Sequence, residues 1–443
     1  DNPYWTFYEN FQTDTRDRYF GNFALDYDVN DWISVLGRFT FDTYAELQEE
    51  RTNVGSSNVP FYGRFNNNVS EFNYDFIATF NKKLNDKFNL DGNLGFSLRR
   101  NEWSSIRANT NGGLNLPGIY TLDNTKNALT PGELTEYEAV QMVDGLYGRV
   151  TLAYDDKAFL EASLRRDRNS SLPKAENTYY YWSATASVIL SEYLQKDWLD
   201  FAKLRANVAN VYSGTVPYRV FDAYTINAGF GSTGSASNPG SKNNSTLRPE
   251  KTKNWEIGLE TNMFDRRLGF DITYYNTTSE DQITAVPVSN ATGFTSVLLN
   301  AGSIENKGIE LQLKGNPVRT DDFRWDVNFN WARNRNKVLS LADGIENLEL
   351  GSFQGGVSIN ASPGSPVGII RGRDFVYKDG QKVIGTNGRY LRTATSNEII
   401  GDTNPDWTGG IQNMFRYKNF DFSFLIDIQS GGDLFSLDTY YGY

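Results

Sequence analysis

Apolar and polar residues alternate along much of this chain with a period of two. Between residues 323 and 331 every second residue is Phe, Trp or Val, and the residues between them are Arg, Asp or Asn. Such alternation places apolar side chains on one face of a β-strand and polar side chains on the other. The same rhythm starts at Trp255, Leu268 and Ile309. The stretch 255–336 therefore predicts four consecutive strands.

Similar segments on both sides of this stretch bring the prediction to about fourteen strands. Many of them approach or exceed the roughly ten residues that cross a membrane in a tilted barrel. A soluble β-sandwich is the alternative that the alternation alone leaves open. Outside 255–336, the strands are expected at 18–29, 32–47, 69–84, 88–100, 145–154, 158–168, 178–191, 201–213, 407–417 and 420–430.

The connections between these strands are alternately short and long. In an antiparallel meander every second connection lies on the same side, so the short ones share one side and the long ones the other. Short periplasmic turns and long extracellular loops are typical of an outer-membrane barrel. Short connections fall near residues 30, 85, 156, 195, 265, 318 and 418, and long extracellular loops are expected near 47–68, 101–144, 214–250, 285–301 and 339–405.

The composition agrees with strands that are wet on one face. Hydrophobic residues make up 39% of the 443 residues, aromatic residues make up 14%, and the mean hydropathy is −0.53. This combination is expected where half of each strand faces water and the lipid-facing half is rich in aromatics. The aromatic residues on the apolar faces could form a platform for sugars, but contact with lipid or with its interfaces is the favoured interpretation.

The sequence contains no cysteine and no histidine. It therefore offers no disulfide, no thiolate metal ligand and no Ser-His-Asp site. The net charge of −11 argues against nucleic acid as a partner, because binding to phosphates needs a basic surface. We expect no catalytic residue, no metal site and no cofactor, and we interpret the chain as part of a protein that is not an enzyme.

Six short phrases stand out along the chain. They are RRD (165–167), LRPEKT (247–252), WEIGLE (255–260), NAGSIENKGIE (300–310), IGDTNPDW (400–407) and SGG (430–432). In wording and in order they resemble phrases of the SusC/RagA-type TonB-dependent transporters of Bacteroidetes outer membranes. With the strand rhythm, the resemblance covers about residues 4–443.

The resemblance implies a fold and a set of partners. It implies an up-and-down antiparallel barrel of 22 strands around an N-terminal plug, with a SusD-like surface lipoprotein as lid and energy from the TonB complex. We therefore interpret residues 1–443 as a partial outer-membrane β-barrel domain that is all-β and multi-pass. About 14 of the 22 strands are recognised, whereas the plug, the TonB-binding segment and the strands beyond residue 432 are not.

Aromatic residues in the long loops are the candidate ligand contacts. Trp103 and Tyr120 are expected in the loop 101–144, and Tyr224 and Phe230 in the Gly/Ser-rich loop 214–250. Aromatic faces stack on sugar rings and pack against peptides. The same residues could instead fold their own loop or contact the lid protein.

Other motifs have a structural and a functional interpretation. Arg165, Arg166 and Arg168 could contact an anionic ligand or lipopolysaccharide, or could be solvated rim residues. The acidic turns at 379–380 and 402–404 could hold Ca²⁺, although turn chemistry explains them as well. Gly308 favours a bulge or a close approach of backbone.

The function implied by this resemblance is TonB-dependent import of a nutrient through the outer membrane. An oligosaccharide is the first candidate cargo and a peptide is the alternative. A surface receptor or adhesin that transports nothing is a further possibility, and outer-membrane lipid and lipopolysaccharide are expected neighbours.

Overall fold

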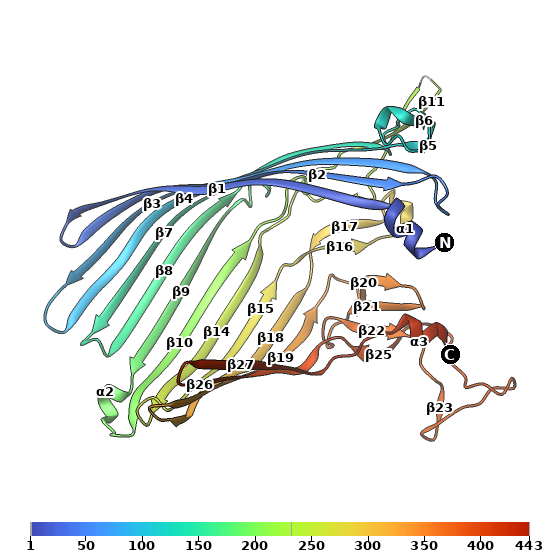
Figure 1. Ribbon diagram of the computed structural model, residues 1–443. Helices are drawn as coiled ribbons and strands as arrows, with labels where there is room; N and C mark the ends of the chain where they lie inside the picture. The colour runs from blue at the N-terminus through green and yellow to red at the C-terminus, as the bar shows by residue number, and fades with distance from the viewer. Residues whose placement is uncertain (1, 232, 443) are drawn as a thin grey trace.

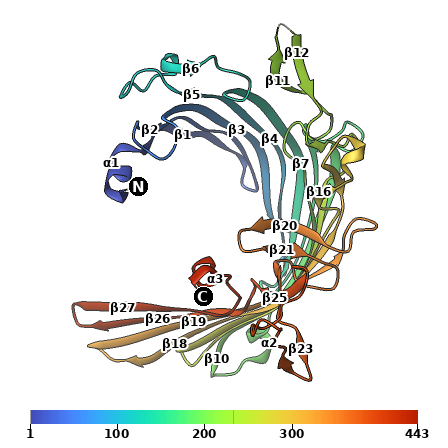
Figure 2. The same ribbon diagram turned by 90° about the vertical axis from the view of Figure 1, so that its right-hand side faces the viewer.

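The computed structural model describes residues 2–231 and 233–442, and a 14-stranded antiparallel sheet dominates them. Each strand of this sheet pairs with the next spanning strand along the chain, and Figure 2 shows the sheet curled into a C whose opening lies between β1 and β27. Its strands are β1 (Phe11–Asn30), β2 (Ile33–Thr52), β3 (Phe61–Lys83), β4 (Phe88–Asn109), β7 (Leu134–Tyr154), β8 (Ala158–Asn169), β9 (Thr178–Ile189), β10 (Leu199–Ser213), β14 (Glu250–Met263), β15 (Leu268–Glu280), β18 (Ser303–Arg319), β19 (Phe323–Ser340), β26 (Pro405–Tyr417) and β27 (Phe420–Gly431).

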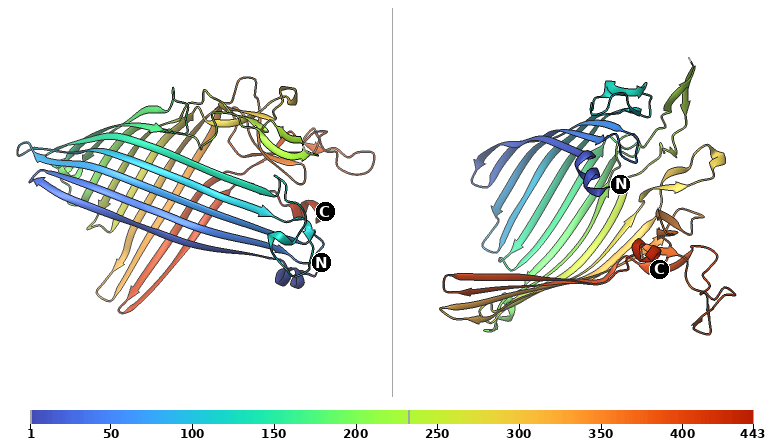
Figure 3. Two further views of the ribbon diagram at one scale, coloured as in Figure 1. Left: turned by 90° about the horizontal axis from the view of Figure 1, so that it is seen from above. Right: turned by 45° about the vertical axis from the view of Figure 1, so that its right-hand side comes forward.

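The two ends of the sheet differ, as the alternation of short and long connections predicts. Tight turns lie at one end, called here the turn end, and the long connections gather at the other, called the loop end (Figures 1 and 3). The described loop-end segments form small sheets from β5 (Asn111–Leu114), β6 (Thr125–Asn127), β11 (Thr225–Phe230), β12 (Thr233–Ser237), β13 (Ser241–Lys242), β16 (Ile283–Pro287), β17 (Ser296–Asn300), β20 (Leu348–Phe353), β21 (Val357–Ala361), β22 (Ile369–Gly372), β23 (Tyr377–Lys378), β24 (Gln381–Lys382) and β25 (Glu398–Asp402).

Helical structure is sparse in the described residues. Asn2 caps the first helix, since its side-chain oxygen accepts a hydrogen bond of 3.0 Å from the Tyr4 amide. No described helix has the length and apolar character needed to cross a membrane. The helices are α1 (Pro3–Glu9), α2 (Ser191–Leu194) and α3 (Leu437–Gly442), with 3-10 turns η1 (Leu122–Asn124) and η2 (Asn290–Thr292).

The predicted all-β fold with about fourteen spanning strands is confirmed, but several strands extend further at the loop end than predicted. The first strand starts at Phe11, and β4 continues to Asn109 in register with β7, which starts at Leu134. Regular strand thus occupies part of the ranges expected as loops near 47–68 and 101–144. These extensions carry polar residues on both faces, so they lack the apolar alternation on which the prediction depended.

Asparagine side chains fix several tight turns at the turn end. Asn85 Oδ1 accepts hydrogen bonds from the Lys87 and Phe88 amides at 2.9 and 3.0 Å. Asn30 Oδ1 does the same for the Trp32 and Ile33 amides, both at 3.0 Å. The side chain thereby mimics a backbone turn, which explains why these short polar links reverse the chain.

The concave and convex faces of the sheet can be assigned from packing. Val338 on β19 is fully buried against Leu348 and Ala361 of the β20–β21 segment, which lies toward the inside of the C in Figure 2. Because alternate residues of a strand share a face, Asn328 and Asn330 are concave, whereas Phe329 and Trp331 are convex.

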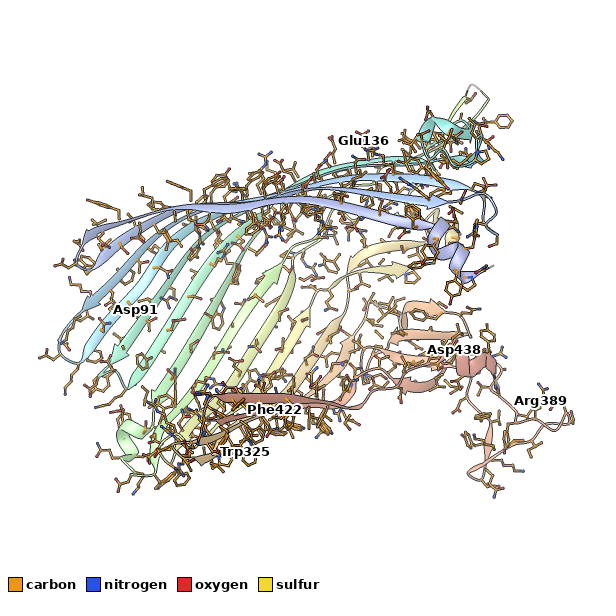
Figure 4. All side chains as sticks on the ribbon, in the orientation of Figure 1. Asp91, Glu136, Trp325, Arg389, Phe422 and Asp438 are labelled. Atoms are coloured by element: carbon orange, nitrogen blue, oxygen red, sulfur yellow. The ribbon has the colours of Figure 1, made fainter. Side chains whose placement is uncertain are left out.

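Aromatic side chains pack on the convex face near the turn end. The Trp325 and Phe415 rings stack with centroids 5.6 Å apart, and Phe415 also lies 6.3 Å from Phe422. Trp325 and Phe422 are labelled in Figure 4. Such contacts between neighbouring strands contribute roughly 0.5–1.5 kcal/mol each beyond area burial. Their position on the convex face is that of an aromatic girdle at a lipid interface.

Gly308 is a point of close approach between strands, as its sequence context suggested. It faces Asn334 across the β18–β19 ladder and Tyr275 across the β15–β18 ladder. A Cβ on Gly308 would lie only 2.3 Å from the carbonyl oxygen of Arg333 and 2.7 Å from the Tyr275 hydroxyl. The backbone oxygen cannot rotate away, so any side chain here must displace a strand.

We expect Gly308→Ala to destabilise the protein by about 1–3 kcal/mol, the usual cost of inserting atoms into a packed site. Urea unfolding in detergent measures this effect. Gly37→Ala on β2 is the matched control, because a Cβ at Gly37 would meet no atom within 4 Å. Equal stability of the two variants would contradict the close approach at Gly308.

Candidate functional site

The concave face of the sheet is lined by paired charges. Arg205 on β10 makes hydrogen bonds of 2.7 and 2.9 Å to Asp271 on β15, and it also donates to Thr273 Oγ1 at 2.6 Å. Gly258 on β14 lies between Arg205 and Thr273 in the ladder, and a Cβ there would lie 2.7 Å from the Arg205 side chain. The missing side chain at Gly258 lets the guanidinium cross an intervening strand.

A second charged cluster repeats this arrangement. Arg165 on β8 makes a hydrogen bond of 2.7 Å to Asp167 and reaches Ser97 on β4 at 2.9 Å, across β7. It passes over Gly145, where a Cβ would lie 2.3 Å from the Arg165 guanidinium. The Tyr181 hydroxyl donates to the other oxygen of Asp167 at 2.8 Å, so this 7%-exposed carboxylate is fully engaged.

A polar pocket of about 570 Å³ lies at the loop end of this wall, beside the second cluster. Gln141 on β7 helps to shape it, because its amide nitrogen donates to Ser171 Oγ at 2.8 Å and to the Thr215 carbonyl at 2.9 Å. These bonds hold the segment after β10 against β7 and β8. The other lining residues are Arg99, Asn169, Ser213, Gly214, Val216, Arg219, Glu250, Ile283, Ala285 and Leu298.

The charges around this pocket are unevenly satisfied. Glu250 Oε1 accepts a hydrogen bond of 2.7 Å from the Ile283 amide. By contrast, neither Arg99 nor Arg219 has a carboxylate partner within the part of the chain that the structure describes. Two guanidinium groups with free donors, together with neighbouring amide side chains, can bind carboxylates or hydroxyl groups of a polar ligand.

Two of the aromatic ligand candidates belong to the β4–β7 region. Trp103 lies within strand β4, opposite Val69 and Ala139, rather than in a loop, because the β4–β7 ladder continues past it. Tyr120 does lie in the connection between β5 and η1. Arg51 covers its ring at 5.3 Å, and Asn124 fixes this connection through a hydrogen bond of 2.6 Å to the Ile119 carbonyl.

The environment of Tyr120 is electrostatically distinct. Burial raises the pKa of the Tyr120 phenol, the nearby Glu9 carboxylate raises it further, and the Arg51 guanidinium partly offsets both effects. The phenol is therefore a neutral hydrogen-bond donor at physiological pH. This supports either a ligand contact or a packing role for Tyr120.

Of the other two candidates, Tyr224 directly precedes the β11–β12 hairpin and Phe230 is the last residue of β11. Tyr224 is 75% exposed and Phe230 is 91% exposed. Figure 2 shows this hairpin projecting away from the rest of the loop end. The four predicted residues do not line the pocket described above, and their role as ligand contacts stays a prediction.

Sequence reasoning missed the arginines and amides of the pocket. Arg99 and Gln141 lie on concave-facing positions of long strands, where the prediction expected only solvated residues or loop. Strand parity was the available signal, because Arg99 and Gln141 lie on the faces of their strands opposite the apolar positions.

The acidic residues of the turns at 379–380 and 402–404 have structural roles in those turns. Asp379 and Gly380 adopt positive φ values of 50° and 75° in the β23–β24 turn. Asp402 Oδ1 accepts hydrogen bonds from the Asn404 amide at 2.9 Å and from its side chain at 2.6 Å. Within residues 2–231 and 233–442, no group of three or more acidic side chains is arranged to hold a metal ion.

The whole chain matches a family model. Residues 1–443 match the model described as TonB dependent receptor-like, beta-barrel. The chain is 26% identical over 461 residues to the TonB-dependent receptor P26 of Formosa agariphila, covering 95% of this chain and 46% of that protein. It is also 25% identical over 206 residues to the TonB-dependent receptor SusC of Bacteroides thetaiotaomicron, covering 41% of this chain and 19% of SusC.

Solved structures show the same fold. The RagAB peptide transporter superposes with a TM-score of 0.81 at 18% identity, covering 95% of this chain and 48% of that chain. The chain thus spans about half the length of the relatives that it matches over most of its own length.

We expect Arg165→Gln to destabilise the wall by about 3 kcal/mol, because it leaves the buried Asp167 carboxylate without its cation. Urea unfolding in detergent measures the change. Arg18→Gln is the matched control, since the Arg18–Asp42 pair is exposed to solvent, where screening leaves an ion pair little effect on stability. Similar losses in both variants would refute the special role of the Arg165 cluster.

Proposed function

The chain belongs to the TonB-dependent receptor β-barrel family and is of the SusC/RagA type, and from this premise we propose that it forms wall strands of an outer-membrane importer for oligosaccharides. The observation that carries this proposal is the two-faced wall, which is aromatic on its convex side and ion-paired on its concave side. Lipid solvates the first face, and a water-filled or plugged lumen suits the second.

The wall is open between β1 and β27 in the described residues. A strand edge in hydrocarbon leaves backbone N–H and C=O groups unsatisfied, each at a cost of several kcal/mol. One edge of β1 and one edge of β27 have no partner among the described residues. We propose that further strands pair with both edges, consistent with the 22-strand barrel that the family resemblance implies.

The residues of this chain would bind and orient cargo rather than react with it. We propose that the loop end is extracellular and that ligand first meets Trp103, Tyr120, Tyr224 and Phe230. Arg99, Arg219 and Gln141 then offer donors at the mouth of the lumen. No bond is made or broken in this process, so no residue has a catalytic role.

The partners follow from the same proposal. A SusD-like surface lipoprotein would close over the loop end, where the small sheets provide an irregular surface (Figure 1). The TonB complex would act through a plug held against the concave wall. The charged side chains of that wall are already paired with one another. Few of them are therefore free to bind a plug tightly, which suits a polar plug surface that must move.

Peptide import by the same mechanism is the second candidate. The RagAB peptide transporter shares the fold. Arg99 and Arg219 are also suited to bind carboxylates, which every peptide carries and many neutral oligosaccharides lack. A receptor or adhesin that transports nothing is the third candidate, and an uptake assay separates it from the other two.

We expect the double variant R99Q/R219Q to lower ligand affinity by about 10-fold or more, since two charge-assisted hydrogen-bond donors are lost. The measurement is calorimetry of the full-length protein with an oligosaccharide panel and a peptide panel, combined with uptake in cells. Lys87→Gln removes one positive charge at the turn end, away from the pocket, and should leave affinity unchanged.

The outcome on each panel decides between the candidates. Binding and uptake of oligosaccharides support the first proposal, and uptake of peptides alone supports the second. Binding without uptake supports a receptor or adhesin. Full affinity in R99Q/R219Q would show that the pocket is not the ligand site.

A further inference from the structure

Four basic residues form a patch on the convex face of β18 and β19, called here the convex basic patch. Arg333, Arg335 and Lys337 occupy alternate positions of β19, and Lys307 lies directly opposite Arg335 on β18. Alternation places all four on the face that carries Trp331 and Leu311, which is the convex face. All four side chains belong to exposed residues.

The patch has more positive charge than its neighbours neutralise. Lys307 pairs with Glu305 at 3.1 Å, and Arg335 pairs with Asp406 at 2.8 Å. Arg333 and Lys337 form no salt bridge with any described residue, although Lys337 lies directly opposite Glu305 in the β18–β19 ladder. Four cations thus share two carboxylates, those of Glu305 and Asp406, and this excess of positive charge favours an additional anion.

The patch begins where the apolar band of the convex face ends. Below Arg333 toward the turn end, the convex residues of β19 are Trp331, Phe329 and Val327. The same transition occurs on β14, where Trp255 is followed toward the loop end by Lys253, which pairs with Glu280 at 2.7 Å, and then by Lys251. On both strands the basic residues directly follow the aromatic residues that mark a lipid interface.

We propose that the convex basic patch binds the phosphate groups of an anionic lipid in the outer leaflet of the membrane. The proposal rests on the proposed function only for the membrane location and for the loop end being extracellular. Arg333 and Arg335 lie two residues apart, or about 7 Å along the strand, so neighbouring phosphate oxygens can contact both guanidinium groups. Lys337 extends the patch by a similar step away from the apolar band.

The position of the patch favours a lipid as its ligand over cargo, plug residues or free phosphate. Transport cargo and plug meet the concave face, which the sheet itself separates from Arg333. A lipid molecule bound here can place its acyl chains along Trp331 and Phe329 while the phosphates of its headgroup contact the cations. A free phosphate ion gains only the second contact, because it has no apolar part.

The test uses the delipidated full-length protein in a neutral detergent, titrated with bis-phosphorylated lipid A and followed by native mass spectrometry. We expect the triple variant R333Q/R335Q/K337Q to bind lipid A about 10-fold or more weakly than the parent. Phosphatidylcholine and inorganic phosphate should bind neither protein measurably. Lys314→Gln removes one positive charge from the concave face of the strand that carries Lys307, and should retain parental affinity.

Two outcomes would overturn the inference. Parental affinity in the triple variant would show that lipid A binds elsewhere, and equal binding of inorganic phosphate would show a free-anion site. The single variant R333Q keeps the test valid if the triple variant misfolds, since Arg333 leaves no carboxylate unpaired. Loss of lipid binding with normal uptake, or the reverse, separates this inference from the proposed import function.

Discussion

The structure depends on one constraint, which is that a wall immersed in lipid must satisfy its backbone hydrogen bonds within the sheet. Antiparallel ladders meet this demand along 14 strands, and the β3–β4 ladder runs without a register shift from Gly63 to Lys83. Because side chains alternate, a slip of one residue would turn an entire strand inside out. Register therefore decides at once which residues meet lipid and which meet the lumen.

Glycine residues let long side chains on the concave face reach across a neighbouring strand. Arg165 and Arg205 each reach a partner two strands away because Gly145 and Gly258 leave room on the strand between. Such bridges tie three or more strands together on the polar face, where apolar packing is unavailable. The buried clusters around Leu247 and Val338 lie at the loop end, so along the rest of the wall backbone ladders and paired charges supply the cohesion.

Much of the fold could be predicted from the sequence because lipid imposes apolar alternation on one face. This is why the strands near Trp255 and Trp325 were recognised, and why the short turns near Asn85 and Asp265 fell at one end. Apolar alternation is absent where both faces of a strand contact water, as in β4 beyond Arg100. Trp103 was consequently assigned to a loop. The pocket was not predictable in this way, because Arg99, Gln141 and Arg219 converge only through strand register and a hydrogen-bonded loop segment.

Charge is also partitioned by strand parity, and this changes what the net charge of −11 implies. Acidic residues such as Asp91, Asp167 and Asp271 face the lumen, where arginines engage them. Arg333, which forms no salt bridge with a described residue, and Lys337 face the opposite way. A whole-chain charge averages over two surfaces that never meet the same partner, so an acidic protein can present a basic surface to lipid phosphates. For a two-faced wall, the charge of each face is therefore the quantity that predicts its partner.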